Sequence, residues 1–149
     1  MEDELTDYTN RFSTTFKMAH RKISQSVFGE LNTELTAPQL FTLAMISMEQ
    51  TPKQSHLADK LGVKPSAITV MIDRLVQSGH VIRKHHETDR RIVLVENTAE
   101  GTAVLAHYND VQKKIIFRGL SQLPPEELHI FVNAFEKLLI FISSKDPFL

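Results

Sequence analysis

The segment from Gln54 to Thr98 constrains the fold of this chain more than any other part. Ser55 is expected to cap a short helix, and Gly62 should end it, because glycine readily adopts the left-handed conformation found after helices. A second helix should open at Pro65 or Ser66. Its apolar residues recur at helical spacing: Ile68, Met71, Ile72, Leu75 and Val76.

Two short β-rich runs follow this helix pair. They cover residues 81–84 and 92–95, on either side of a polar loop at residues 85–91. Helix, turn, helix and hairpin in that order predict a winged helix-turn-helix, a shape that fits duplex DNA.

The flanking segments predict four more helices. Residues 5–31 carry apolar side chains at helical spacing, and Thr36 with Gln39 forms a capping-box pattern before the next helix. Thr98 is expected to cap a fifth helix, and residues 128–142 indicate the last one. The expected fold class is therefore mainly α, with six helices around a two- or three-stranded β-wing.

Residues 1–149 are expected to form a single domain with two functional parts. Residues 33–97 would be the DNA-binding lobe, and residues 1–32 and 98–149 a helical dimerisation region. The outer helices are rich in Phe, Leu and Ile, which favours a homodimer of intertwined terminal helices over a monomeric bundle.

Composition excludes several classes of protein. Cysteine is absent, which rules out disulfides, thiolate metal sites and thiol-based redox sensing. No run of about 18 apolar residues indicates a membrane span, and the acidic N-terminus does not resemble a signal peptide, so a cytoplasmic location is expected. The seven histidines show no ligand spacing, and no catalytic motif is present. We therefore expect no metal, no cofactor, no membrane partner and no enzymatic activity.

Charge is unevenly distributed along the chain. Residues 53–91 contain eight Lys or Arg and four Asp or Glu, a local charge of +4, although the whole chain carries −1. A positive middle segment between negative ends orients a protein on a polyanion. The alternative is a chance fluctuation of surface charge.

The second helix of the pair supplies candidate base contacts. With its apolar stripe facing the core, Ser66, Thr69 and Val70 point outward, where hydroxyl and methyl groups meet base edges in the major groove. Lys64 and Arg74 are better placed to contact phosphates, which position a protein without specifying sequence. The alternative is an ordinary surface helix.

The hairpin loop supplies candidate minor-groove contacts. It carries Arg90 and Arg91, and arginine on a protruding hairpin is suited to the negative potential of that groove. Asp89 is expected to anchor one of the arginines, or the turn itself, by a charge-assisted hydrogen bond. The alternative is a solvated charged turn.

These motifs resemble the MarR (multiple antibiotic resistance regulator) family. The resemblance lies in Asp73-Arg74-Leu75 with Gly79-His80-Val81-Ile82-Arg83, in Asp89-Arg90-Arg91, and in Val95-Glu-Asn-Thr-Ala-Glu-Gly101. It implies a homodimer of winged lobes that binds a pseudo-palindromic duplex and represses its own or neighbouring genes. One departure is Thr69, where some relatives have arginine, which favours readout of DNA shape.

Carried over by position, the resemblance implies base contacts from Ser66, Thr69 and Val70, support from Arg74, and wing contacts in which Arg91 rather than Arg90 enters the groove. The full set of expected DNA-binding residues is Ser55, Lys64, Pro65, Ser66, Ala67, Thr69, Val70, Arg74, Lys84, Thr88, Asp89, Arg90 and Arg91.

The resemblance also implies a small aromatic effector. The candidate pocket residues are Phe12, Phe16, His20, Phe41, Met45 and Met48. The alternative for these side chains is core packing, the commoner role of a Met and Phe stripe. The alternative function for the whole chain is a winged-helix protein-interaction module without specific DNA binding.

Overall fold

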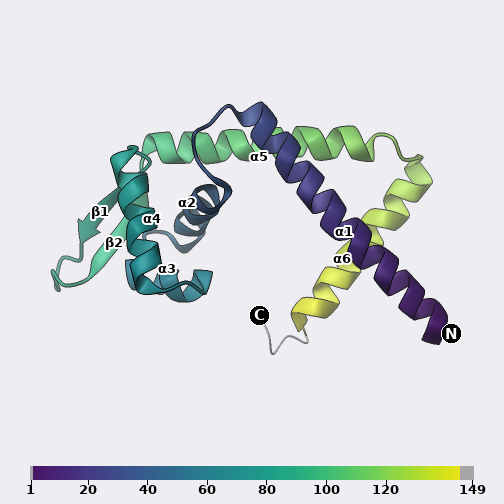
Figure 1. Cartoon of the computed structure of the whole chain (residues 1–149), viewed down its shortest axis with the longest axis horizontal. Coiled ribbons are helices and arrows are strands. Elements are labelled where there is room, and N and C mark those ends of the chain that lie inside the picture. Colours follow the sequence, from purple (N-terminus) through teal and green to yellow (C-terminus); the bar gives the residue numbers. More distant parts are fainter. Residues whose placement is uncertain (1, 145–149) are drawn as a thin grey trace. The chain divides into compact units, whose positions relative to one another are not determined.

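The computed structural model describes residues 2–144. In this part of the chain the order of elements is α1 (Glu2–Leu31), α2 (Ala37–Glu49), α3 (Gln54–Leu61), α4 (Pro65–Gln77), β1 (Val81–His85), β2 (Val93–Asn97), α5 (Ala99–Leu120) and α6 (Pro125–Ser144) (Figure 1). The mainly α fold class with a winged helix-turn-helix is confirmed, and its wing is two-stranded within the described residues.

The chain divides into two compact units, each described by itself below. One comprises residues 27–111, here called the lobe unit, and the other combines residues 2–26 with residues 112–144. The expected DNA-binding segment, residues 33–97, lies within the lobe unit.

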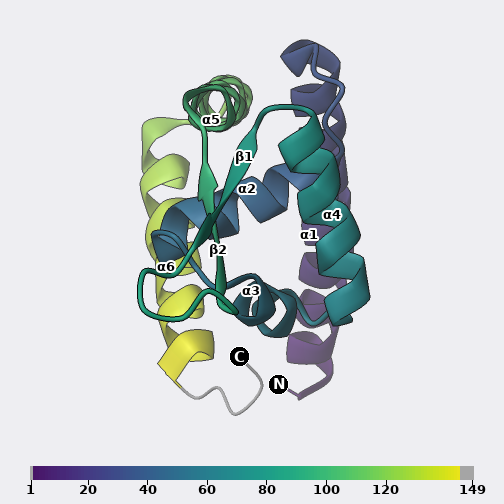
Figure 2. The ribbon, with the colours of Figure 1, turned by 90° about the vertical axis from the view of Figure 1, so that its left-hand side faces the viewer.

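The lobe unit is held by a core to which every one of its elements between α2 and β2 contributes. The side chains with almost no exposure are Leu43 and Ile46 of α2, Leu57 of α3, Ile72 and Leu75 of α4, Val81 of β1 and Val95 of β2. In Figure 2 the hairpin and α4 lie in front of α2. Burial of this apolar surface fixes the positions of α3, α4 and the hairpin, because the hydrophobic effect dominates packing.

The hairpin is antiparallel and in a single register. Val81 pairs with Asn97 and His85 pairs with Val93. The chain before α3 joins the same sheet, because Lys53 forms an isolated bridge with Leu94, and Val95 N donates to the carbonyl oxygen of Pro52 at 3.0 Å.

This pairing corrects the expected start of α3. The N-cap residue is Lys53, not Ser55, and Ser55 lies inside the first turn. Residues 52–53 are held extended against β2, so the helix begins directly after them. The preference of serine for N-cap positions depends only on adjacent residues, so it could not indicate the pairing of Lys53 with Leu94.

Strand β2 also starts and ends later than the sequence pattern indicates, at residues 93–97 rather than 92–95. Ile92 belongs to the loop closure, since its N–H donates to the carbonyl oxygen of Asp89 at 3.0 Å. At the other end the strand extends to Asn97, whose side-chain Nδ2 donates to the carbonyl oxygen of Leu43 at 2.9 Å.

The predicted cap of α5 is confirmed, and it makes a tight junction. Gly101 N donates to Thr98 Oγ1 at 3.1 Å, and Thr98 Oγ1 donates to the carbonyl oxygen of Gly79 at 2.7 Å. Thr98 N donates to the carbonyl oxygen of His80 at 3.0 Å. The start of α5 is thereby fixed against the turn that follows α4.

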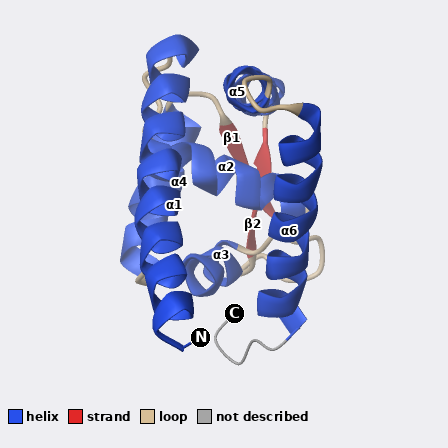
Figure 3. Ribbon diagram, turned by 90° about the vertical axis from the view of Figure 1, so that its right-hand side faces the viewer, coloured by secondary structure: helices blue, strands red, loops and turns tan. Residues whose placement is uncertain are grey.

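In the other unit, α1 and α6 meet through aromatic rings. Phe12 and Phe16 stack at 5.8 Å between ring centroids, and each ring lies against Phe135 of α6, at 6.4 and 6.2 Å. Within its described length α6 has no buried residue. Figure 3 shows α1 and α6 as long, uninterrupted helices. None of the helices described here has the length and apolar character needed to cross a membrane.

Candidate nucleic-acid interface

Helix α4 turns its polar side outward. Ile68, Ile72 and Leu75 are buried, as their spacing predicts. The three positions expected to point outward are exposed, Ser66, Thr69 and Val70, and Asp73 and Gln77 on the same side are exposed too. The N-cap residue Lys64 makes no side-chain bond to the first turn. The N-terminal half of α4 therefore presents small polar and apolar side chains, which suit contacts in a major groove.

A hydrogen-bonded network ties this face to α3 and β1. Gln54 Nε2 donates to Thr69 Oγ1 at 3.0 Å, and Arg83 Nε donates to Gln54 Oε1 at 3.2 Å. Arg83 Nη2 pairs with Asp73 Oδ1 at 2.7 Å, and Thr69 Oγ1 donates to the carbonyl oxygen of Pro65 at 2.9 Å. Thr69 is thus held from both sides.

This network was not predicted from the sequence. Gln54 was not among the expected DNA-binding residues, and Arg83 entered only through the charge of its segment and the family motif. Thr69 and Arg83 lie 15 and 29 positions from Gln54 along the chain, so no local spacing connects them.

The loop between the strands is closed by its own side chains. Asp89 Oδ1 accepts from Arg91 N at 3.0 Å and from Arg91 Nε at 3.2 Å, which confirms that Asp89 anchors an arginine. His85 Nδ1 lies 2.9 Å from the carbonyl oxygen of Arg90. The Arg91 amide, and then its guanidinium, hold the pKa of the Asp89 carboxyl below its usual value.

Arg91 remains available despite this anchor. Its side chain is 92% exposed, so the bond to Asp89 restricts its direction without burying it. A guanidinium held in this way presents its remaining donors to solvent.

The cations of the lobe unit fall into two groups. Lys84 pairs with Glu96 on the neighbouring strand, Arg83 pairs with Asp73, and Lys60 pairs with Glu49. Within the described residues Lys53, Lys64, Arg74 and Arg90 form no ion pair, so their charges face solvent uncompensated at short range. These four cations and Arg91 are the strongest candidates for phosphate contacts.

A hollow of about 370 Å³ lies between the start of α3 and the wing. It is lined by Lys53, Gln54, Ser55, Arg91, Ile92 and Val93. Lys53 makes no side-chain cap bond to α3, which leaves backbone N–H groups of the first turn without a capping side chain. Two cations and a helix N-terminus suit this hollow to a phosphate of the DNA backbone. Ser55 and Arg91 were predicted from the sequence as DNA contacts, and Lys53 was not.

The expected DNA-binding residues all lie in the lobe unit. Twelve of the thirteen are exposed, and Asp89 is half-buried. Ser55 lies on α3, residues 64–74 lie at the start of or along α4, Lys84 lies on β1, and the other four lie in the hairpin loop.

The expected effector residues have different surroundings in each unit. Phe12 and Phe16 pack with Phe135, and His20 is exposed on α1. On α2, Phe41 and Met48 are exposed and Met45 is half-buried. The two phenylalanines of α1 contact Phe135 within their own unit, and about half of each side chain stays exposed.

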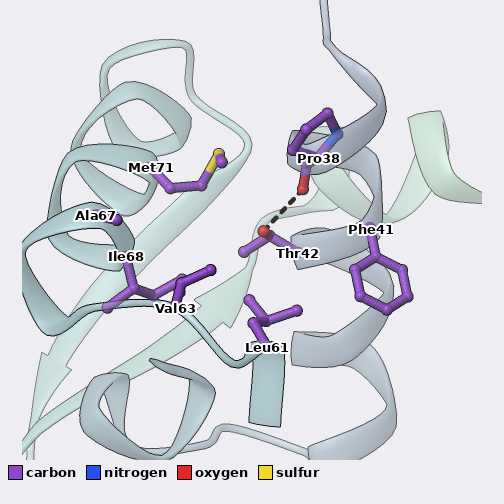
Figure 4. A pocket seen from close by; sticks show the side chains of 8 residues that line it. All are labelled: Pro38, Phe41, Thr42, Leu61, Val63, Ala67, Ile68 and Met71. Carbon is purple, nitrogen blue, oxygen red and sulfur yellow. Dashed lines mark hydrogen bonds between the residues drawn. The ribbon is translucent and has the colours of Figure 1, made fainter. Parts of the chain in front are cut away.

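One of these residues borders an apolar pocket inside the lobe unit. Phe41 lies at a hollow of about 170 Å³ between α2 and α4 (Figure 4). The other lining residues are Pro38, Thr42, Leu61, Val63, Ala67, Ile68 and Met71. Thr42 Oγ1 donates to the carbonyl oxygen of Pro38 at 2.8 Å, so its hydroxyl donor is already used. The pocket therefore offers an apolar environment. No cluster of three or more His, Asp or Glu side chains suited to a metal occurs among residues 2–144.

Comparison with known proteins supports this assignment of the lobe. The family model described as the MarR family matches residues 35–93. The HTH-type transcriptional repressor MdtR of Bacillus subtilis (strain 168) is 38% identical over 94 residues, 63% of this chain and 61% of MdtR. The chain thus matches less than two thirds of the length of MdtR.

A second relative matches more of its length. The uncharacterized HTH-type transcriptional regulator YpoP of Bacillus subtilis (strain 168) is 32% identical over 79% of this chain and 86% of YpoP. The crystal structure of Streptococcus pneumoniae FabT in complex with DNA has the same fold, with a TM-score of 0.73 over 93% of this chain and 99% of FabT at 15% identity. The matched segment, the similarity to YpoP and the winged lobe together place this chain in the MarR family of transcriptional regulators.

Proposed function

We propose that the chain is a homodimeric repressor that binds a specific, pseudo-palindromic DNA site and leaves it when a small ligand binds. The observation that carries the proposal is that the outer side of α4 and the hairpin loop are both exposed in the same compact unit. The outer face of α4 is exposed, and the hairpin loop next in the chain holds Arg91 at its tip. A helix and a cationic wing tip of this kind fit a major groove and an adjacent minor groove.

Two comparisons support DNA as the partner. MdtR is named a transcriptional repressor, and the fold of this chain is also that of FabT, which was crystallised with DNA. Regulation of its own or neighbouring genes follows from the same relationship and is part of the proposal.

The proposal of a homodimer rests on the exposed apolar surface of the terminal helices. On α6, Phe131, Leu139 and Ile142 are 50%, 59% and 46% exposed, and on α1 Leu5 is 66% exposed. An exposed apolar patch of this extent marks an association surface. Two lobes related by a two-fold axis would match a pseudo-palindromic site.

The first test is fluorescence anisotropy with the purified full chain. One probe is duplex DNA from upstream of its own gene, and the other is a scrambled duplex of equal length, each titrated across a salt series. We expect a preference for the first probe and a steep loss of affinity as salt rises, because phosphate contacts release counterions. No binding even at low salt would overturn the proposal and favour a protein-interaction module.

Release by a ligand is supported by the pocket between α2 and α4. A cavity of about 150 Å³ lined by apolar side chains holds benzene in another protein, so the 170 Å³ pocket is suited to a single ring. Three lining residues, Ala67, Ile68 and Met71, belong to α4 itself. An occupant would therefore press on the helix that we propose to read DNA.

Benzene is a suitable probe for this pocket, because it is a single ring without polar groups. We expect benzene to lower the DNA affinity of the wild-type chain, and Val63→Phe, which fills the pocket from its rim, to abolish that response while binding to DNA persists. An equal response of both proteins to benzene would exclude this pocket as the effector site.

A further inference from the structure

The hydroxyl of Thr69 has a restricted hydrogen-bonding capacity. A threonine hydroxyl has one hydrogen to donate and two lone pairs that accept. The hydrogen of Thr69 is directed to the carbonyl oxygen of Pro65 at 2.9 Å, and one lone pair accepts from Gln54 Nε2 at 3.0 Å. One acceptor position remains for a partner in solution.

The orientation of the Gln54 amide is dictated by Arg83. The guanidinium of arginine only donates, so the atom of Gln54 that lies 3.2 Å from Arg83 Nε must be the carbonyl oxygen. The amide nitrogen then faces Thr69. Arg83 is itself held by Asp73 at 2.7 Å. The donor and acceptor of each hydrogen bond, from Arg83 through Gln54 to Thr69, are therefore determined by the ion pair at Asp73.

Gln54 already uses one N–H and one oxygen lone pair within the lobe unit. A glutamine reads adenine by using its oxygen and nitrogen together, so turning the amide toward a base would break the bonds to Thr69 and Arg83. Its side chain is half-buried, whereas Thr69 is exposed. Gln54 is therefore placed to act through Thr69.

We propose that Gln54 is a positioning residue that makes Thr69 a one-way reader of DNA, able to accept a hydrogen bond and unable to donate one. A free threonine hydroxyl contacts donors and acceptors alike. Held by Gln54, Thr69 favours a base that offers an amino group in the major groove, adenine or cytosine, over guanine or thymine. This inference rests on the proposed DNA-binding function.

The test measures base preference at each position of the binding site. Starting from the site that the wild-type chain prefers, every position is changed to all four bases, and relative affinities are measured by competition at fixed salt. We expect one position in each half-site where adenine or cytosine is favoured over guanine or thymine by about fivefold, the effect of one hydrogen bond.

Three variants assign that preference to the network. Thr69→Val keeps the shape but removes the hydroxyl, so the preference should vanish. Thr69→Ser keeps the hydroxyl and should retain it. Gln54→Met keeps the length without hydrogen bonds and should reduce the preference to below about twofold, because the hydroxyl is then free to turn. In a Thr69→Val background, Gln54→Met should have no further effect on this position.

Two controls separate this role from a merely structural one. Removing the amino group alone, with purine in place of adenine at the position, should weaken wild-type binding and leave Thr69→Val unaffected. In the free protein, Thr69→Val should shift the NMR signals of the Gln54 side-chain amide, and thermal unfolding should show that each variant is folded.

The outcomes distinguish this inference from the proposed function. Specific binding in which Thr69→Val changes no base preference, or in which guanine or thymine is favoured at the affected position, overturns the inference alone. An equal effect of Gln54→Met with and without the Thr69 hydroxyl also overturns it. Absence of any specific site for the wild-type chain overturns the proposed function and this inference with it.

Discussion

At the scale of single residues, the wing depends on the pair formed by Asp89 and Arg91. An acidic residue beside DNA repels the phosphates, so its presence needs a compensating interaction with neighbouring residues. Here Asp89 holds both the amide and the guanidinium of Arg91, which lowers the conformational freedom that the arginine would lose on binding.

We expect Arg91→Ala to weaken DNA binding at least tenfold, because it removes a pre-oriented cation from the proposed minor-groove contact. Anisotropy with the specific duplex measures this. Arg21→Ala, which removes an exposed charge from α1, is the control and should change affinity little. Unchanged affinity of Arg91→Ala, with the dimer intact, would remove the wing from the mechanism.

The Asp89 carboxyl should titrate below the value of about 3.9 that is usual for aspartate. The Arg91 amide and then its guanidinium favour the charged form, so the pKa is lowered. The anchor is therefore fully present above the unfolded pKa and is lost as pH falls through the folded pKa. A carboxyl-detected NMR titration checks this, and a value at or above that of an unfolded peptide would contradict it.

At the scale of elements, the two glycines of α5 make a matched pair. A Cβ on Gly101 would overlap the carbonyl oxygen of His80, which is backbone and cannot turn away. A Cβ on Gly119 would meet nothing within 4 Å. The first glycine is required where α5 begins against the turn after α4, and the second is not.

We expect Gly101→Ala to lower the free energy of unfolding by about 3 kcal/mol, the range of forced overpacking. Gly119→Ala should raise it by about 0.5 to 1 kcal/mol, because alanine is the better helix former. Urea denaturation followed by circular dichroism measures both. Equal effects of the two substitutions would show that the close approach of α5 to His80 is not rigid.

The elements themselves could be predicted from local patterns, and their connections could not. The spacing of Ile68, Ile72 and Leu75 predicted the buried side of α4, and Thr98 predicted the start of α5, because periodicity and capping are properties of adjacent residues. The start of α3 was wrong because Lys53 pairs with Leu94 across the sheet. The same reason hid the link between Gln54 and Thr69.

In the candidate site, too, features set by adjacent residues were predicted and contacts between distant residues were not. The outward positions of α4 followed from its apolar stripe, and the anchoring role of Asp89 followed from its place in the same loop as Arg90 and Arg91. The hollow at the start of α3 did not follow from the sequence, since Lys53 and Arg91 come together only when the hairpin folds.

At the scale of the whole molecule, assembly should depend on the apolar side of α6. Ile142 shares that side with Phe131, Phe135 and Leu138, which lie at helical spacings before it, whereas Ile140 lies nearer the polar side with Asn133 and Lys137. Both isoleucines are exposed, at 46% and 67%. They therefore form a matched pair for testing association.

We expect Ile142→Glu to shift the wild-type dimer toward monomer, because a charge in an apolar interface must be desolvated. Ile140→Glu, the same exchange on the other side of the helix, should have a clearly smaller effect. Sedimentation velocity at micromolar concentration measures both. A wild-type chain that sediments as a monomer would refute the homodimer.

The hairpin and the Thr98 junction differ in how much change of chain length they tolerate. Residues inserted between His85 and Val93 would enlarge the loop beyond the last strand pair and leave the register intact. A single residue inserted between Thr98 and Gly101 would instead displace the bonds to Gly79 and His80 together. Insertions and deletions in this chain should therefore be accommodated at the tip of the wing and excluded from its base.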